Sequence, residues 1–260
     1  MKIAVVAPSC TLNPEAAEAV AAIVAARGDC ELIIDPQCFL SAGHFAGSDA
    51  DRLGALRAVM ADATVDAVWF ARGGYGSNRI AEAAVADLPN AARSKTYLGY
   101  SDAGFLLAAF DRAGLKVAHG PMPQDVLRQG GEAAIARALD WLVRCDPAAL
   151  EPGLTPGRRA LAFNLTVLTH LLGTALEPDF TGAELLIEDV AEHDYRIDRM
   201  MFHLVGSQSV RRCAALRLGR ISEVPDNDPP FGRAARAFVE EWCGRAGITF
   251  AGRSSRPSPP

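Results

Sequence analysis

Strand-like and helix-like patterns alternate along the first half of the chain. Short apolar runs rich in β-branched and aromatic residues, such as Ile3–Ala7 and Val65–Phe70, are followed by longer segments with apolar residues at helical spacing. The first of these helices is predicted to begin after Asn13, a favourable cap that is followed by Pro14, and to end near Ala26. Further strands and helices are predicted at Glu31–Ile34, Asp51–Asp62, Ser77–Asp87, Tyr97–Gly99 and Asp102–Ala113. Strands and helices that alternate in this way indicate βαβ units around a parallel sheet.

The second half of the chain carries a separate set of predicted elements. A helix is predicted from Gly131 to about Arg144, and residues 146–157 are rich in turn signals. Beyond them, helices and strands are predicted at Leu165–Leu172, Glu184–Glu188, from Tyr195, and at Ala214–Leu218, Arg233–Cys243 and Ile248–Ala251. The sequence therefore predicts an α/β protein in three parts. An N-terminal domain at 1–130 has a mostly parallel sheet flanked by helices (flavodoxin-like or Rossmann-like), a linker region follows at 131–160, and a smaller C-terminal α/β domain occupies 161–260.

The composition and net charge of the chain limit the kinds of molecule that the protein is expected to bind. The chain has 260 residues, of which 50% are hydrophobic, and this fraction is too high for a disordered protein. The 26 Lys and Arg residues against 31 Asp and Glu residues give a net charge of −5. Nucleic acid and anionic membranes both require a basic face, so we expect neither as a partner. A small molecule or a peptide fits this balance better.

Cysteine spacing and the N-terminus bear on the compartment. The six cysteines form no CxxC pair and no zinc-ligand spacing with His, so buried free thiols in a reducing compartment are expected. The apolar run after Met1 and Lys2 is too short for the core of a signal peptide, and no run approaches the roughly 18 residues that span a bilayer. We therefore expect a cytoplasmic protein.

Two turns between a predicted strand and a predicted helix could carry chemistry. In the first, Arg72–Gly76, the glycines let the backbone approach a ligand and direct N–H groups at an anion. It lacks the spacing of dinucleotide and P-loop motifs, and a plain tight turn is an equal alternative. In the second turn Ser101 follows Gly99 and Tyr100, so its hydroxyl could project from the sheet edge as in a nucleophile elbow. The alternative is that Ser101 only caps the following helix.

Two polar residues of the second half are further candidates. Glu188 ends an apolar strand, so its carboxylate is expected to be partly buried and to need a partner such as His or Arg. Asn164 stands at the start of the helix predicted from Leu165, where Asn is more often a cap than a ligand.

The motifs together resemble the LD-carboxypeptidase family of serine peptidases, which includes the murein tetrapeptide carboxypeptidases and a microcin-immunity branch. The family has a strand followed by RGGYG, then G-[FY]-S-D before a helix, then HGPM. Its second domain has an NLxxL…LLGT stretch and an EDxxExxYR[IV]DR stretch. The matching segments here are Arg72–Gly76, Gly99–Asp102, His119–Met122, Asn164–Leu168 with Leu171–Thr174, and Glu188–Arg199. They occur in the family's order, and the resemblance extends from Ile3 to about Ala251, nearly the whole chain.

The resemblance implies a two-domain peptidase with its active site between the domains. Ser101 would be the nucleophile, Glu188 would orient a histidine base, and the N–H groups of Gly74 and Asp102 would form the oxyanion hole. Arg72, Tyr75 and Asn164 are further residues expected to bind the substrate. The substrate would be cytoplasmic murein tetrapeptide, which loses its terminal D-alanine during peptidoglycan recycling. The resemblance implies a homodimer and neither a metal nor an organic cofactor.

The sequence departs from the family pattern at the catalytic histidine. In the family this residue follows a glycine near the C-terminus, whereas here Gly252 is followed by Arg253 and no histidine comes after His203. Residues 254–260 form a divergent tail, for which a premature stop or a shifted reading frame is one explanation. We expect impaired activity, with His119 as a possible stand-in base. The alternatives are a non-catalytic peptide-binding homologue, a microcin-immunity peptidase and, third, a nucleotide-binding module using the Arg72–Gly76 turn.

Overall fold

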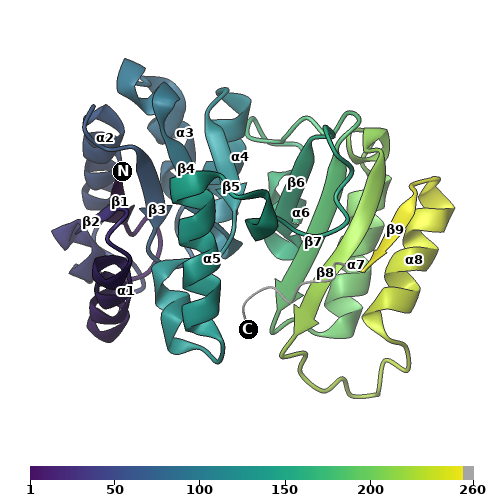
Figure 1. Ribbon diagram of the computed structural model, residues 1–260. Helices are drawn as coiled ribbons and strands as arrows, with labels where there is room; N and C mark the ends of the chain where they lie inside the picture. The colour runs from purple at the N-terminus through teal and green to yellow at the C-terminus, as the bar shows by residue number, and fades with distance from the viewer. Residues whose placement is uncertain (254–260) are drawn as a thin grey trace. The chain divides into compact units, whose positions relative to one another are not determined.

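The computed structural model describes residues 1–253, which form two compact units divided between Leu150 and Glu151 (Figure 1). Each unit is built on its own parallel sheet. The divergent tail predicted at 254–260 lies outside the described residues. The prediction of two α/β domains, the first with a mostly parallel sheet flanked by helices, is confirmed.

The first unit has a five-stranded sheet in the order β2-β1-β3-β4-β5, with every neighbouring pair parallel. This is the flavodoxin-like strand order, in which the direction of winding reverses between β1 and β3. Its helices and strands are β1 (Lys2–Val6), α1 (Pro14–Arg27), β2 (Glu31–Ile34), α2 (Asp49–Ala61), β3 (Ala67–Phe70), α3 (Asn78–Ala86), β4 (Thr96–Gly99), α4 (Gly104–Arg112), β5 (Lys116–His119) and α5 (Gly131–Arg144).

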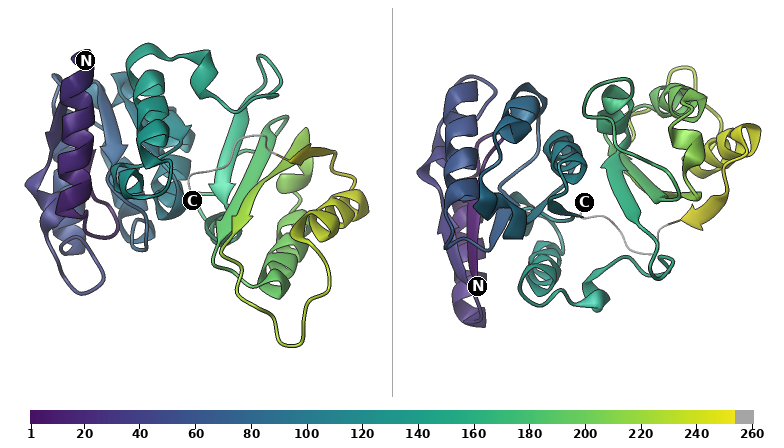
Figure 2. Two further views of the ribbon diagram at one scale, coloured as in Figure 1. Left: turned by 60° about the horizontal axis from the view of Figure 1, so that its bottom comes forward. Right: turned by 90° about the horizontal axis from the view of Figure 1, so that it is seen from above.

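Local signals account for the ends of these helices. Asn13 caps α1 by accepting a hydrogen bond from the N–H of Glu15 (2.9 Å), and Gly28 ends it in the left-handed conformation. Ser48 and Asp51 form a capping box at the start of α2. Helices α1 and α5 pack on one face of the sheet, and α2, α3 and α4 contact one another in sequence order (Figure 2).

The predicted linker region differs from the structure. Residues 131–144 form α5, the helix predicted there, but this helix belongs to the first unit. The reason is its apolar stripe: Ile135, Ala138, Leu139 and Leu142 are buried in the same core as Ile3 and Trp69. The boundary between the units lies after α5 and the short turn that follows it.

The second unit has a four-stranded parallel sheet in the order β6-β7-β8-β9. Its helices and strands are β6 (Ala160–Asn164), α6 (Leu165–Leu171), β7 (Glu184–Val190), α7 (Asp194–Gly206), β8 (Ala215–Ser222), α8 (Ala235–Ala246) and β9 (Phe250–Arg253). The pairing of β7 with β8 shifts register between Ile187 and Asp189. Between these two points β7 advances by two residues and β8 by three, so the extra residue of this bulge lies in β8, opposite Glu188. Bulges often lie next to active sites, where they re-aim a side chain.

All six cysteines are free thiols, but only Cys38, Cys213 and Cys243 are buried. Cys145 is exposed, and Cys10 and Cys30 are partly exposed, so the expectation that all six are buried is wrong. Among residues 1–253, no helix combines the length and the apolar character that crossing a bilayer requires.

Candidate functional site

Four loops of the first unit follow the carboxyl ends of adjacent parallel strands. They comprise residues 7–13 after β1, 71–77 after β3, 100–103 after β4 and 120–122 after β5. Ligands of open parallel sheets bind at this edge, next to the point where the strand order reverses. The predicted residues Arg72, Gly74, Tyr75, Ser101 and Asp102 all lie in two of these loops.

Ser101 lies on a strained turn between β4 and α4. Its φ is +57°, a left-handed conformation that costs a non-glycine residue on the order of 1–3 kcal/mol. Neither the short 3-10 turn Ser101–Ala103 nor α4 has a side-chain cap, so the structure does not support a capping role for Ser101. Gly99 before it is required by close packing, because a Cβ there would lie 2.8 Å from the ring of Phe70. A strained serine between a strand and a helix is the geometry of a nucleophile elbow.

The glycine turn after β3 packs directly against this serine. A Cβ built on Gly73 would lie 2.9 Å from Ser101 Oγ, so only glycine leaves room for the hydroxyl. Gly74 has φ +117°, and a Cβ there would lie 2.3 Å from the Sγ of Cys10. Within the described part of the chain, no backbone carbonyl accepts a hydrogen bond from the N–H of Gly74 or of Asp102. Asp102 is buried and Gly74 is exposed. Both N–H groups belong to residues next to Ser101 or next to Gly73, which packs on Ser101, and N–H groups of this kind can bind an anionic oxygen.

Replacing Gly73 by Ala tests this packing. The added methyl group is expected to displace the Ser101 hydroxyl and to lower the rate at which a serine-directed fluorophosphonate labels Ser101 by about 10- to 100-fold, the scale of a misplacement near 1 Å. Gly54→Ala is the matched control: Gly54 lies in α2, a Cβ there meets nothing within 4 Å, and labelling should not change. Equal labelling rates in the two variants would contradict the close packing of Gly73 on Ser101.

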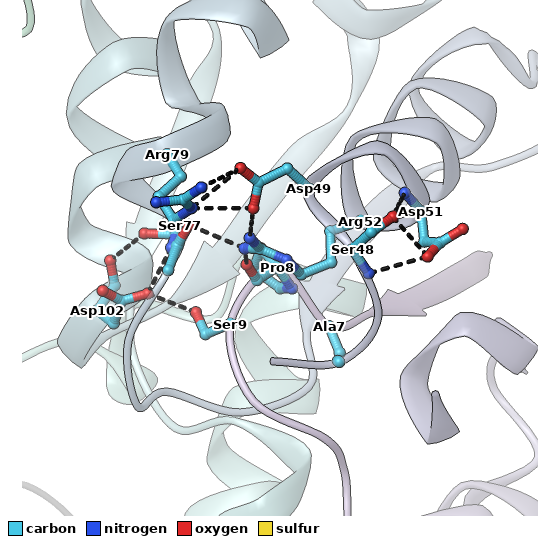
Figure 3. A network of polar contacts seen from close by, with 12 residues as sticks. Ala7, Pro8, Ser9, Ser48, Asp49, Asp51, Arg52, Ser77, Arg79 and Asp102 are labelled. Carbon is cyan, nitrogen blue, oxygen red and sulfur yellow. Dashed lines mark hydrogen bonds and ion pairs between the residues drawn. The ribbon is translucent and has the colours of Figure 1, made fainter. Parts of the chain in front are cut away.

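The carboxylate of Asp102 joins two loops to the serine turn (Figure 3). Its Oδ2 accepts hydrogen bonds from Ser9 Oγ (2.5 Å), in the loop after β1, and from the N–H of Ser77 (2.8 Å), after β3. Ser77 Oγ donates in turn to the carbonyl of Asp102 (2.5 Å). Asp102 is 2% exposed. Its side chain therefore fixes the turn, while its N–H stays available.

Tyr100 anchors the same turn from the other side. Its hydroxyl donates to Asp125 Oδ1 (2.9 Å) and accepts from Arg128 (3.2 Å), and its ring lies edge-on to that of His119 at 5.9 Å. Burial raises the pKa of Asp125, and hydrogen bonds from the N–H of Met122 and from Tyr100 act against this rise. His119, at the end of β5, is therefore placed beside the residue that precedes Ser101.

The remaining candidates of the first unit border the glycine turn. Arg72 is exposed and donates to the carbonyl of Thr11 (3.2 Å), so it is tied to the loop after β1. Tyr75 is 46% exposed and its ring lies within 6.1 Å of the rings of His44 and Phe45. Both residues can contact a ligand that approaches the turn.

The candidates of the second unit are Asn164, the last residue of β6, and Glu188, two residues before the end of β7. Asn164 and Glu188 are register partners in the parallel pairing of these strands, and Glu188 is 8% exposed. Asn164 Oδ1 accepts from the N–H of Val167 (3.1 Å), which confirms the capping alternative for this residue, and its Nδ2 donates to Asp189 Oδ1 (2.9 Å). The amide of Asn164 is thus engaged at both ends, and this weakens the expectation that it binds substrate directly.

Sequence reasoning missed the polar network that supports the serine turn. Its unexpected member is Arg52 in α2, which is 1% exposed and shares a buried face with Leu56 and Met60. The sequence did hold one signal: Arg52 precedes Leu56 by four residues and Met60 by eight, and this spacing places all three on one face of a helix. Asp125 and Asp189 are likewise buried carboxylates for which the sequence pattern gave no indication.

Comparisons with known proteins agree with this geometry. Residues 3–120 match the family model of the LD-carboxypeptidase N-terminal domain, and residues 159–251 match that of the C-terminal domain. A protein from Synechocystis sp. named as a carboxypeptidase is 36% identical over 186 residues, 70% of this chain and 60% of its own length. The murein tetrapeptide carboxypeptidase of Pseudomonas aeruginosa is 30% identical over 204 residues, 70% of this chain and 64% of its own.

Solved structures share the fold. The muramoyltetrapeptide carboxypeptidase of Oxalobacter formigenes superimposes with a TM-score of 0.80 at 24% identity, covering 97% of this chain and 87% of that one. The microcin C7 self-immunity protein MccF gives 0.77 at 18% identity, covering 97% and 86%. The alignments span 54–70% of the length of the first four curated relatives. The family resemblance inferred from the motifs is confirmed, and the chain belongs to the LD-carboxypeptidase family.

Proposed function

We propose that this protein is a serine carboxypeptidase that removes the terminal D-alanine from murein tetrapeptide by cleaving an L,D bond. The observation that carries the proposal is the strained Ser101, packed against Gly73 and flanked by the N–H groups of Gly74 and Asp102. The choice of substrate is supported by the names of the curated relatives. A place in peptidoglycan recycling, the cytoplasmic location and the homodimer remain predictions.

In the proposed reaction, Ser101 Oγ attacks the carbonyl carbon of the bond that precedes the terminal D-alanine. The hydroxyl proton passes to a base, and the carbonyl oxygen becomes an oxyanion that accepts hydrogen bonds from Gly74 and Asp102. Collapse of this intermediate breaks the C–N bond, and the base returns the proton to the amine of D-alanine as it leaves. Water then hydrolyses the ester on Ser101, which releases the tripeptide and restores the hydroxyl.

We propose Glu188 as the residue that orients the histidine base. A buried carboxylate holds an imidazole in the required tautomer and stabilises the imidazolium that forms during the reaction. In the first unit, His119 is the candidate stand-in base because its ring lies beside Tyr100, next to Ser101 in the chain. His119→Gln is therefore the variant that decides whether this imidazole takes part.

Release of D-alanine is the test of the proposed activity. The wild-type protein is offered murein tetrapeptide, and D-alanine and tripeptide are quantified; we expect them to appear in equal amounts. A microcin-type aminoacyl nucleotide, offered in parallel, separates the microcin-immunity alternative. Binding of tetrapeptide without release would instead favour the non-catalytic peptide-binding alternative, and binding of free nucleotide would favour a nucleotide-binding module.

A further inference from the structure

A buried arginine lies behind the serine turn, on a helix that carries none of the family motifs. Arg52 of α2 is 1% exposed, and its aliphatic stem shares the buried face of the helix with Leu56 and Met60. Burying a guanidinium is costly unless its N–H groups are bonded and its charge is paired. The partners of Arg52 therefore indicate why the chain places a charge there.

Arg52 bonds the loops that follow β1 and β3 (Figure 3). One of its terminal nitrogens donates both to the carbonyl of Pro8 and to the carbonyl of Gly76, the latter at 2.8 Å. The other terminal nitrogen pairs with the carboxylate of Asp49, one turn earlier in the same helix. The guanidinium also lies over the ring of Phe45, 4.8 Å from its centroid. One side chain thus joins two loops that lie 68 positions apart in the sequence, at Pro8 and Gly76.

Asp102 bonds the next residue in each of these two loops. Pro8 is followed by Ser9, whose hydroxyl donates to the Asp102 carboxylate, and Gly76 is followed by Ser77, whose N–H donates to the same oxygen. Each loop is therefore held at two consecutive residues: the Arg52 guanidinium bonds the first, and the Asp102 carboxylate bonds the second. The two loops contain Cys10 and Gly74, whose close packing was described above.

We propose that Arg52 is a positioning residue for the serine site: it holds the loops after β1 and β3 so that the N–H of Gly74 lies beside Ser101. This inference rests on the proposed function, because it assigns Gly74 a role in binding the oxyanion. Arg52 itself touches none of the reacting atoms. Lysine cannot replace it, because a single ammonium group on a shorter side chain cannot bond two carbonyls and a carboxylate in the fixed fork geometry of a guanidinium.

Arg52→Lys is compared with Arg57→Lys. Arg57 lies in the same helix and also donates to a backbone carbonyl, that of Ala83 at 2.8 Å, but its partner is in α3 and not in a loop of the site. Arg52→Lys is expected to lower kcat for D-alanine release by about 10- to 100-fold with KM within about threefold, as misplaced catalytic groups do. Arg57→Lys should leave both constants unchanged. Amide hydrogen exchange of residues 71–77 should accelerate in Arg52→Lys alone.

The outcomes separate this inference from the proposed function. Unchanged kcat and unchanged exchange at 71–77 in folded Arg52→Lys would overturn the inference. No D-alanine release by the wild-type protein would overturn the proposed function, and exchange at 71–77 would still decide whether Arg52 holds the loop. If Arg52→Lys does not fold, Asp49→Asn decides, because it removes the charge that pairs with the Arg52 guanidinium with little change in volume. A loss in kcat of about 3- to 10-fold supports the inference, and no loss contradicts it.

Discussion

Replacing Ser101 by Ala is expected to abolish D-alanine release; with His119 serving as the base, kcat should fall by about 10⁴- to 10⁶-fold, the loss found when a serine peptidase loses its nucleophile. The reason is that no other group described at the end of β4 can form the ester intermediate. The backbone at this position has φ +57°, and Ala is strained there as Ser is, so the thermal stability of the variant should be close to that of the wild type.

Two further variants of serine positions sharpen this prediction. Ser94→Ala is the matched control, since Ser94 is exposed and its hydroxyl donates only to the nearby carbonyl of Ala91, so kcat should not change. Ser101→Gly should be as inactive as Ser101→Ala but more stable by about 1 kcal/mol, because glycine adopts a positive φ without strain. Full activity in Ser101→Ala would exclude a covalent mechanism at this residue.

Glu188→Gln is expected to lower kcat by about 10³- to 10⁴-fold while the protein stays folded. This expectation rests on the role proposed for Glu188. The amide has the size of the carboxylate and preserves packing, but it cannot stabilise the imidazolium of the proposed base or fix its tautomer. Glu188 is 8% exposed, and the position opposite it requires a glycine, because a Cβ on Gly219 would lie 3.2 Å from the Glu188 Cβ. The measurement is steady-state D-alanine release together with thermal unfolding.

Glu184→Gln is the matched control for this variant, because Glu184 is a buried glutamate at the start of the same strand. Burial acts to raise its pKa, but hydrogen bonds from Arg217 and from the N–H of Thr155 outweigh this and hold the pKa below its ordinary value. An ionised glutamate of this kind stabilises the fold above its unfolded pKa, near 4.5, and the contribution is lost as pH falls through the lower folded value. Glu184→Gln should therefore be less stable than the wild type at pH 7, approach the wild type as pH falls from about 4.5 through the lowered pKa of Glu184, and keep its kcat. Equal losses of kcat in both variants would remove the specific role of Glu188.

Much of the fold could be predicted because its elements carry local signals. The cap at Asn13, the glycine at 28 and the buried run that became β3 fixed α1 and the parallel sheet from residues close together in the chain. Strand β6 was not predicted, because the turn signals at residues 146–157 precede it directly. Its five residues form a strand through pairing with β7, which lies more than twenty positions later in the chain. Helix α5 was predicted but assigned to a linker, because much of the core that it packs into, such as Ile3, Val20 and Trp69, comes from distant parts of the chain.

The site also contains residues that local sequence signals reveal and residues that they do not. Ser101 and the glycine turn were recognisable because each lies between a strand and a helix, in the order that the family shares. Arg52 was not recognisable as part of the site, because it follows Asp49 and Asp51, and charged neighbours are typical of an exposed helix start. Its burial depends on carbonyl groups of two distant loops, and no local pattern reports them. Asn164 shows the opposite case, in which the simpler interpretation as a cap was confirmed.

The reactivity of the Ser101 hydroxyl is the central claim, and covalent labelling tests it most directly. The wild-type protein is treated with a fluorophosphonate, digested and mapped by mass spectrometry, with Ser101→Ala treated in parallel. The phosphonyl group should be found on Ser101, with loss of fluoride, and Ser101→Ala should take up none. Labelling of another residue in the wild type, or equal labelling of both proteins, would contradict the account.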